Sequence, residues 1–231
     1  MDVAIRNSCV DYDSYRAQRT KSLFNVDSGA DFSRDFHLPI DELVGWTIGV
    51  CVGPSGSGKS SIGRALEAEG WEMWDGRHHW PADEPVIDAL VPDGDYDEAT
   101  AALASVGLGD VPSWLRPYAV LSNGERFRAD LARVLAERHD RVVVDEFSSV
   151  VDRQVAQVGA GAFQKAWRRG NDGSRQAVLL SCHLDILEWV RPNWVLATET
   201  GELYLDYRPG DERAKKAYDK YPEVGRLEIR P

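Results

Sequence analysis

Short apolar runs alternate along the chain with longer segments whose apolar residues recur at helical spacing. The short runs are rich in β-branched and other apolar side chains, which is typical of buried strands. They cover residues 46–52, 71–74, 141–146, 177–181 and two short segments near 193–206. Strands that alternate with helices are joined by crossovers, and such connections place the strands parallel in one sheet. The pattern therefore predicts an α/β fold with a mainly parallel sheet.

The segments between these runs have the spacing and the end signals of helices. They cover residues 59–70, 84–91, 95–107, 123–139 and 153–169. Gly107 closes one of them, as a glycine at the end of a helix commonly does. Residues 75–97 are rich in proline and aspartate, so we expect a loop there with only a short helix inside it. We expect one domain over residues 1–208, followed by a weakly ordered extension at 209–231.

Composition narrows the classes of function. The chain has 231 residues, 43% of them hydrophobic and 28% charged, with a net charge of −11. This balance disfavours a broad nucleic-acid-binding face, because such faces cluster Lys and Arg. No segment approaches the roughly 18 apolar residues that a membrane helix needs. Cys9, Cys51 and Cys182 form no CxxC pair; we expect Cys51 and Cys182 to be buried, reduced thiols, which favours a cytoplasmic protein.

A glycine-rich segment follows the first predicted strand of the sheet. Residues 53–60 read GPSGSGKS and match the P-loop pattern GxxxxGK[ST] between a strand and a helix. Glycines let successive backbone N–H groups turn inward as an anion nest, at the positive end of the helix that follows. Lys59 is expected to reach the β- and γ-phosphates of ATP, and the Ser60 hydroxyl to bind Mg²⁺. The predicted nucleotide-binding residues are Gly53, Ser55, Gly56, Ser57, Gly58, Lys59, Ser60 and Ser61.

Two other predicted strands end in side chains suited to phosphate chemistry. Asp145 and Glu146 close the run VVVDE, as the acidic pair of a Walker B strand does. We expect Asp145 to hold Mg²⁺ and Glu146 to orient or activate the attacking water. His183 ends the next apolar run, 37 positions after Glu146. A neutral imidazole there could donate one hydrogen bond and accept another.

Residues 121–135 read LSNGERFRADLARVL and resemble the signature segment of ABC ATPases, which reads LSGGQ and leads into a helix. In that family the signature lies against the γ-phosphate bound by the opposite subunit, so the resemblance implies a head-to-tail homodimer. The residues implied to act across the interface are Ser122, Asn123, Gly124 and Glu125. Asn123 replaces a glycine and tolerates left-handed backbone geometry, whereas Glu125 replaces the family's glutamine.

The resemblance extends to the two strand ends. The run after Glu146 implies that Asp152 lies at the dimer interface, in what the family calls the D-loop. Phe147 stands where proline is usual, so we expect a less fixed turn there. His183 resembles the switch histidine, which implies a catalytic role beside Glu146.

Other parts of the ABC pattern are shortened or absent. Only 63 positions separate Lys59 from Ser122, which predicts a shortened helical subdomain. No glutamine follows the P-loop where the Q-loop belongs, and residues 77–90 occupy that space. We interpret His78 and His79 in this loop as surface or gating residues and not as a metal site.

An aromatic residue upstream of the P-loop is expected to stack on the adenine. Phe24, Phe32 and Phe36 are the candidates, and core packing is the alternative for each.

The segments around the signature and His183 resemble a soluble branch of ABC ATPases whose cassettes are fused to, or encoded near, acetyltransferase-like domains. This implies an ATP-driven switch that hydrolyses ATP with Mg²⁺ and serves a soluble partner, acetyltransferase-like or nucleic-acid-modifying. The energising subunit of a membrane transporter is the alternative, with the membrane part in another chain. A scaffold that binds ATP without turnover is disfavoured, because both Glu146 and His183 are retained.

Overall fold

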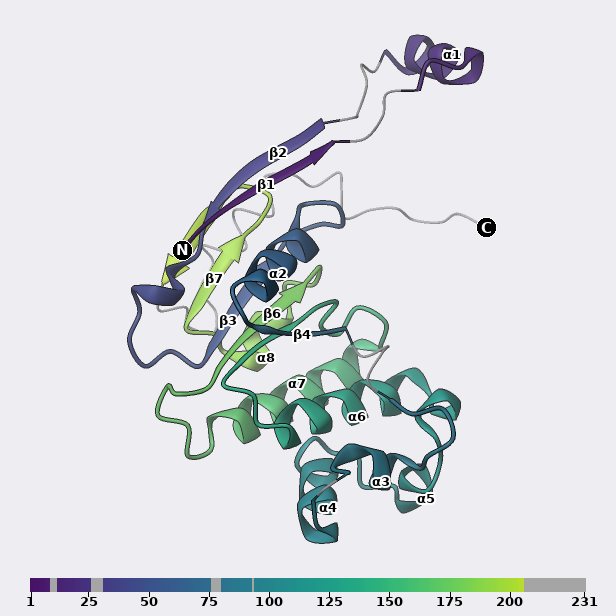
Figure 1. The fold of residues 1–231 in the computed structure, drawn as a ribbon, viewed down its shortest axis with the longest axis vertical. Helices are drawn as coiled ribbons and strands as arrows, with labels where there is room; N and C mark the ends of the chain where they lie inside the picture. The colour runs from purple at the N-terminus through teal and green to yellow at the C-terminus, as the bar shows by residue number, and fades with distance from the viewer. Residues whose placement is uncertain (9–11, 26–30, 76–79, 93, 206–231) are drawn as a thin grey trace.

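The structure is a computed structural model that describes residues 1–8, 12–25, 31–75, 80–92 and 94–205. It consists of an N-terminal hairpin, a central sheet and a helical region on the opposite side of the sheet (Figure 1). Cys9, His78, His79 and the predicted extension at 209–231 lie outside the described residues.

The central sheet has six strands, five of which are parallel. Their order is β4-β5-β6-β3-β7-β8, and β8 is the antiparallel edge strand beside β7. The bounds are β3 Ile48–Val52, β4 Glu72–Trp74, β5 Arg141–Val144, β6 Gln176–Ser181, β7 Trp194–Ala197 and β8 Glu202–Leu205. The mainly parallel α/β sheet is thus confirmed.

Both faces of the sheet are covered, because alternate residues of each strand enter two different hydrophobic cores. In β5, Val142 and Val144 belong to the core under the helical region, and Val143 belongs to the core on the other face. The second core also contains Ile62 and Leu66 from the helix after β3. Continuous apolar strands, without polar alternation, are what a sheet buried on both faces requires.

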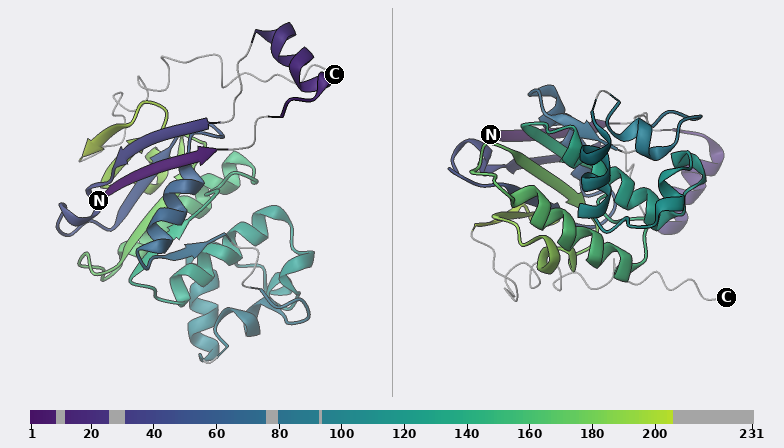
Figure 2. Two further views of the ribbon diagram at one scale, coloured as in Figure 1. Left: turned by 45° about the horizontal axis from the view of Figure 1, so that its top comes forward. Right: turned by 90° about the horizontal axis from the view of Figure 1, so that it is seen from below.

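The helices after the P-loop lie where the apolar spacing places them, and the structure adds two short ones, one before the helix that begins at Asn123 and one after β6, at Ile186–Val190. Their bounds are α2 Lys59–Ala68, α3 Val86–Leu90, α4 Tyr96–Ser105, α5 Val111–Trp114, α6 Asn123–Ala136, α7 Arg153–Arg168 and α8 Ile186–Val190. Two 3-10 turns, η1 Pro39–Asp41 and η2 Tyr118–Val120, complete the set. Gly107 has a φ of +78° just after α4, as a glycine at a helix end requires. Figure 2 shows α3, α4 and α5 gathered beyond α6, away from the sheet.

The N-terminal elements were not predicted from the sequence. β1 Asp2–Ser8 and β2 Asp31–His37 form an antiparallel hairpin, and α1 Tyr15–Phe24 lies at its far end (Figures 1 and 2). Val3, Ile5 and Phe36 are buried against the core that contains α2. No residue of α1 is buried.

Two further observations concern the membrane and the thiols. Among the described residues, no helix is long and apolar enough to cross a membrane. Cys51 is buried as expected, and burial raises the pKa of its thiol far above the usual value. The prediction for Cys182 is wrong, because this residue is only partly buried: it follows β6 at the open carboxyl end of the sheet.

Candidate functional site

Three adjacent strands bring the predicted site residues to one edge of the sheet. β5, β6 and β3 are neighbours and parallel, so their carboxyl ends lie side by side. The acidic pair follows β5, His183 follows β6 and the P-loop follows β3. The Phe147 N–H bonds Leu180 O at 2.8 Å and the Gly53 N–H bonds Ser181 O at 3.2 Å, so β6 holds the loops on both sides of it. Ligands of open α/β sheets bind at this edge.

The P-loop has a backbone that glycine makes possible. Gly56 and Gly58 have φ values of +79° and +99°, in the region that L side chains rarely adopt. Gly58 also caps α2, so the helix begins at Lys59 with its first N–H groups turned to the loop. This backbone is suited to an anion, because the first N–H groups of a helix point away from it without partners inside the helix, and the helix dipole favours negative charge at the same place.

Lys59 is folded into the loop it belongs to. Its ammonium group donates to Gly53 O and Pro54 O, each at 2.8 Å, and the residue is 6% exposed. Burial lowers the pKa of Lys59, and the negative charges of Glu146 and Asp145 oppose that shift. The lysine therefore lies within electrostatic reach of the acidic pair.

Thr198, which follows β7, fixes the P-loop from the other side and was not predicted. Its Oγ1 lies 2.6 Å from Ser57 Oγ and donates to Val52 O at 3.2 Å. Arg34 of β2 in turn donates to Thr198 O at 2.5 Å. No local pattern marks Thr198, because 141 positions separate it from Ser57.

Gly53 has no room for a side chain beside Thr198. A Cβ at Gly53 would lie 2.2 Å from Thr198 Oγ1 and 3.0 Å from Ser57 Oγ. We expect Gly53→Ala to lower the free energy of unfolding by about 1–3 kcal/mol, the usual cost of overpacking a close-packed site. Gly161→Ala on α7 is the matched control, since its Cβ meets nothing within 4 Å and it should stabilise by roughly 0.5–1 kcal/mol. Denaturant unfolding measures both, and equal effects of the two changes would contradict the argument.

The acidic pair lies in a sharply turned segment after β5. The Asp145 N–H bonds Trp74 O at 3.0 Å, and Asp145 Oδ1 accepts from the Glu146 N–H at 2.9 Å. Glu146 and Ser148 have φ values of +50° and +65°, which non-glycine residues seldom adopt. Backbone strain of this kind persists only where the surroundings enforce it.

The packing of Phe147 holds this turn in place, so the expectation of a less fixed turn is wrong. Its ring is 1% exposed and packs edge-on against Phe127 at 5.6 Å and tilted against Phe163 at 6.2 Å. Its carbonyl accepts from Ser181 Oγ at 2.9 Å. A buried aromatic anchor thus fixes the turn where proline would fix φ.

His183 lies among the charges of the site. Its backbone N–H donates to Ser181 Oγ at 3.1 Å. Burial lowers the pKa of His183, Arg153 lowers it further, and Asp185 and Glu146 oppose the shift. A histidine whose pKa falls below the ordinary value of about 6.5 is neutral at pH 7 and can accept a hydrogen bond.

Arg153 connects the segment after β5 with the segment after β6, and it was also not predicted. Its guanidinium forms a bidentate ion pair with Asp185 and donates to Ser148 O at 3.2 Å. It also lies over the ring of Trp189 at 5.0 Å. Arg153 therefore holds the turn after Glu146 against the segment after His183.

The site suits a magnesium ion carried by a nucleotide better than a metal held by protein alone. Among the described residues, no cluster of three or more His, Cys, Asp and Glu could hold a metal. The Ser60 hydroxyl at the start of α2 and the Asp145 carboxylate are hard oxygen ligands, which Mg²⁺ prefers, and it commonly takes the rest of its ligands from phosphate and water. These two residues would hold the ion.

The signature residues form the N-terminus of α6. Ser122 is the N-cap: its Oγ accepts from the Glu125 N–H, and its own N–H donates to Glu125 Oε2 at 2.7 Å. Asn123 and Gly124 are ordinary helical residues with no positive φ, so the left-handed geometry that Asn123 tolerates is not used. Glu125, which stands where the resembled family has glutamine, thus completes a capping box.

The Glu125 carboxylate is held toward the helical region. Glu125 Oε1 accepts from Ser113 Oγ at 2.6 Å, and Ser113 is fully buried. Hydrogen bonds from Ser113 and Ser122 lower the pKa of Glu125 to about 2, so it is ionised at neutral pH. Asp152 has a comparable local role as N-cap of α7, where it accepts from the Gln154 N–H at 2.8 Å.

The structure separates the three candidates for the aromatic residue that stacks on adenine. Phe36 is 3% exposed and belongs to the core under α2, so core packing accounts for it and the stacking role is wrong. Phe24 is 74% exposed at the end of α1 and stays a prediction. The side chain of Phe32 lies outside the described part of the chain.

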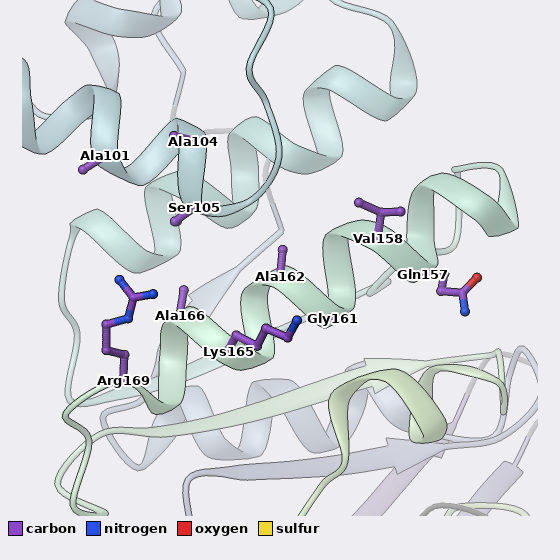
Figure 3. A pocket seen from close by; sticks show the side chains of 10 residues that line it. All are labelled: Ala101, Ala104, Ser105, Gln157, Val158, Gly161, Ala162, Lys165, Ala166 and Arg169. Carbon is purple, nitrogen blue, oxygen red and sulfur yellow. The ribbon is translucent and has the colours of Figure 1, made fainter.

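A separate groove lies between α4 and α7 (Figure 3). Its volume is about 690 Å³, and small side chains such as Ala104 and Ala162 line it with Lys165 and Arg169 at one end. No predicted nucleotide-binding, signature or metal-binding residue is among its lining residues. The groove therefore belongs to the helical region and not to the site at the sheet edge.

Comparisons with known proteins agree with this arrangement. No protein-family model matches the chain. The dimeric, post-hydrolysis structure of the ATP-binding cassette MJ0796 with ADP and Pi superposes with a TM-score of 0.58, over 79% of this chain and 95% of that one, at 12% sequence identity. This chain has the fold of an ATP-binding cassette. The cassette is also similar to a bacterial Atm1-family ABC exporter solved with ATP bound, with a TM-score of 0.59 and 16% identity over 100% of this chain and 42% of that chain.

One curated protein matches by sequence over a short stretch. The hemin import ATP-binding protein HmuV of Rhodococcus jostii (strain RHA1) is 40% identical over 57 residues, which are 24% of this cassette. The match spans only 20% of the length of HmuV.

Proposed function

We propose that this cassette binds ATP with Mg²⁺ and hydrolyses it to ADP and phosphate. The observation that carries the proposal is the meeting of Lys59, Glu146 and His183 at the carboxyl ends of the neighbouring strands β3, β5 and β6. There the charge of Glu146 opposes the lowering of the pKa of both Lys59 and His183. Lys59 would leave its two carbonyl partners to contact the phosphates. Glu146 would orient the attacking water, and neutral His183 would hydrogen-bond the γ-phosphate or that water.

We further propose that two cassettes share two ATP molecules in a head-to-tail homodimer. Ser122 and Asn123 are exposed at the N-terminus of α6, where the helix dipole favours an anion. The hydrogen bonds of Glu125 run to Ser113 and Ser122 of its own helical region. An ATP held by the P-loop of a second copy would supply the anion, and Asp152 would lie at the same interface.

Substitution of the signature serine separates binding from turnover. Ser122→Arg should leave ATP affinity within about twofold and lower the rate of phosphate release by roughly 100-fold or more, the scale for losing a positioned phosphate contact. Ser122 acts on the nucleotide of the other subunit, whereas Lys59 holds that of its own. Ser105→Arg, at the groove of the helical region, is a control for adding the same charge. If Ser122→Arg hydrolyses ATP at the wild-type rate, the shared site is wrong.

The partner that uses the hydrolysis has two candidates. The sequence resemblance to cassettes associated with acetyltransferase-like domains favours a soluble protein partner, acetyltransferase-like or nucleic-acid-modifying. The short match to a hemin import protein favours the energising subunit of a transporter as the second candidate. Affinity capture with the ATP-loaded Glu146→Gln cassette, run separately on soluble and detergent-solubilised membrane fractions, distinguishes them. An acyltransferase or nucleic-acid enzyme from the soluble fraction supports the first candidate, and a polytopic membrane protein supports the second.

A further inference from the structure

A cluster of aromatic and charged side chains joins the loop after β4 to the signature helix. It consists of Trp80, Tyr118, Asp130, Arg126 and Arg133, and we call it the α6 clamp. Arg126, Asp130 and Arg133 are spaced four and three residues apart on α6, so they lie on one face of the helix. Trp80 comes from the loop that stands where the missing glutamine is expected, and Tyr118 from η2 just before the signature.

Both oxygens of Asp130 are used inside the α6 clamp. Oδ1 accepts from Trp80 Nε1 at 2.8 Å, and Oδ2 accepts from the Tyr118 hydroxyl at 2.8 Å. The two rings that donate these bonds are stacked, with centroids 4.9 Å apart and an interplanar angle of 6°. One carboxylate thus fixes two segments that lie 50 and 12 positions away from it in the chain.

The two arginines close the α6 clamp from either side. Arg133 lies 4.9 Å over the Trp80 ring and 5.8 Å over the ring of Trp74, the last residue of β4. Arg126 lies 5.7 Å over the Tyr118 ring and donates to Tyr118 O at 3.2 Å. The α6 clamp therefore connects the end of β4, whose Trp74 O bonds the Asp145 N–H, with the turn that leads into Ser122.

A buried carboxyl group is a costly way to hold α6 in place, if packing is all that is needed. Burial raises the pKa of Asp130 to about 7. The hydrogen bonds from Trp80 and Tyr118 and the charges of Arg133 and Arg126 lower it, but by less than burial raises it. Apolar side chains of the same volume would hold α6 without that penalty. Directional hydrogen bonds and a parallel ring stack instead specify one position of each partner.

We propose that the α6 clamp positions the signature relative to the acidic turn, so that Trp80, Tyr118 and Asp130 act as positioning residues for hydrolysis. Trp80 would connect the sheet edge to the signature helix at the place in the chain where a glutamine is expected. The inference rests on the proposed ATP hydrolysis at a shared site. The described side-chain hydrogen bonds and ring contacts of Trp80, Tyr118 and Asp130 are with one another and with the two arginines of α6, and none is with the P-loop. Nucleotide binding and nucleotide turnover should therefore respond differently to their loss.

The test compares Asp130→Ala with Asp130→Asn. Alanine leaves the Trp80 N–H and the Tyr118 hydroxyl without their acceptor, whereas asparagine can accept from Trp80 and donate to the Tyr118 oxygen. We expect Asp130→Ala to lower phosphate release by about 10-fold or more, since a small misplacement of a reacting group costs up to about 100-fold. Binding of a fluorescent ATP analogue should stay within twofold of wild type. Asp130→Asn should restore most of the rate, and Asp97→Ala, an exposed acid of α4, should match wild type.

Hydrogen–deuterium exchange of the nucleotide-free protein tests the positioning without hydrolysis. Asp130→Ala should speed exchange over residues 118–126 and leave α2 unchanged, and Asp130→Asn should restore wild-type exchange. The inference would be overturned if Asp130→Ala showed wild-type exchange over residues 118–126. It would also be overturned if the wild-type protein hydrolysed ATP and Asp130→Ala did so at the same rate. A wild-type cassette that releases no phosphate would instead contradict the proposed function, and the exchange result would still decide the role of the clamp.

Discussion

Lys59→Ala is expected to weaken ATP binding by roughly 100-fold or more. The ammonium group is the one buried cation of the P-loop, and hydrogen bonds to charged groups contribute about 1.5–3 kcal/mol each. Two lost phosphate contacts at about 1.4 kcal/mol per factor of ten give an effect of this size. Equilibrium titration with a fluorescent ATP analogue measures it, and turnover should be lost in parallel.

The control for Lys59→Ala is Lys165→Ala, which removes the same charge from the exposed face of α7. Thermal unfolding of both variants shows whether the loss of binding reflects the site or the fold, because Lys59 also holds Gly53 O and Pro54 O. Wild-type affinity in a folded Lys59→Ala protein would remove the P-loop from the proposed site.

Glu146→Gln is expected to lower phosphate release by roughly 100-fold or more and to retain ATP binding. The change keeps the shape of the side chain and removes its ability to accept a proton from water, and a positioned general base contributes about 10²–10⁴-fold. Because ATP is then held without turnover, the variant should elute as a dimer with ATP and Mg²⁺ and as a monomer with ADP on a sizing column. Glu67→Gln, on the exposed side of α2, makes the same chemical change away from the site and should behave as wild type.

His183→Ala extends the same prediction to the second catalytic residue. We expect a similar loss of turnover with little change in affinity, since His183 follows β6 and does not belong to the phosphate-binding loop. If Glu146→Gln eluted from the sizing column at the same volume with ATP as with ADP, that result would count against the shared site. Wild-type turnover in His183→Ala would make that histidine structural.

The sequence by itself determined the parts of the site whose geometry is local. GPSGSGKS needs only its own glycines and the helix that follows, and strand ends that are adjacent in a parallel sheet meet whatever the rest of the chain does. For that reason the P-loop and the acidic pair could be named as candidates from their own residues, and the mainly parallel fold followed from the alternation of runs. His183 was named from its place after an apolar run together with the resemblance to ABC ATPases. The substitution of Glu125 for glutamine was also visible, although its use as a capping box with Ser122 was not.

The tertiary structure alone decided which distant side chains support those parts. Thr198 meets Ser57 across 141 positions and Trp80 meets Asp130 across 50, and no periodicity encodes either contact. Packing also reversed two expectations: Phe147 fixes its turn from within an aromatic core, and Cys182 is partly exposed after β6. For Phe36 it decided between the two alternatives, in favour of the core under α2. Burial and hydrogen bonding at long range depend on how whole elements pack, so they set the fine geometry of a site whose chemistry the local sequence already specifies.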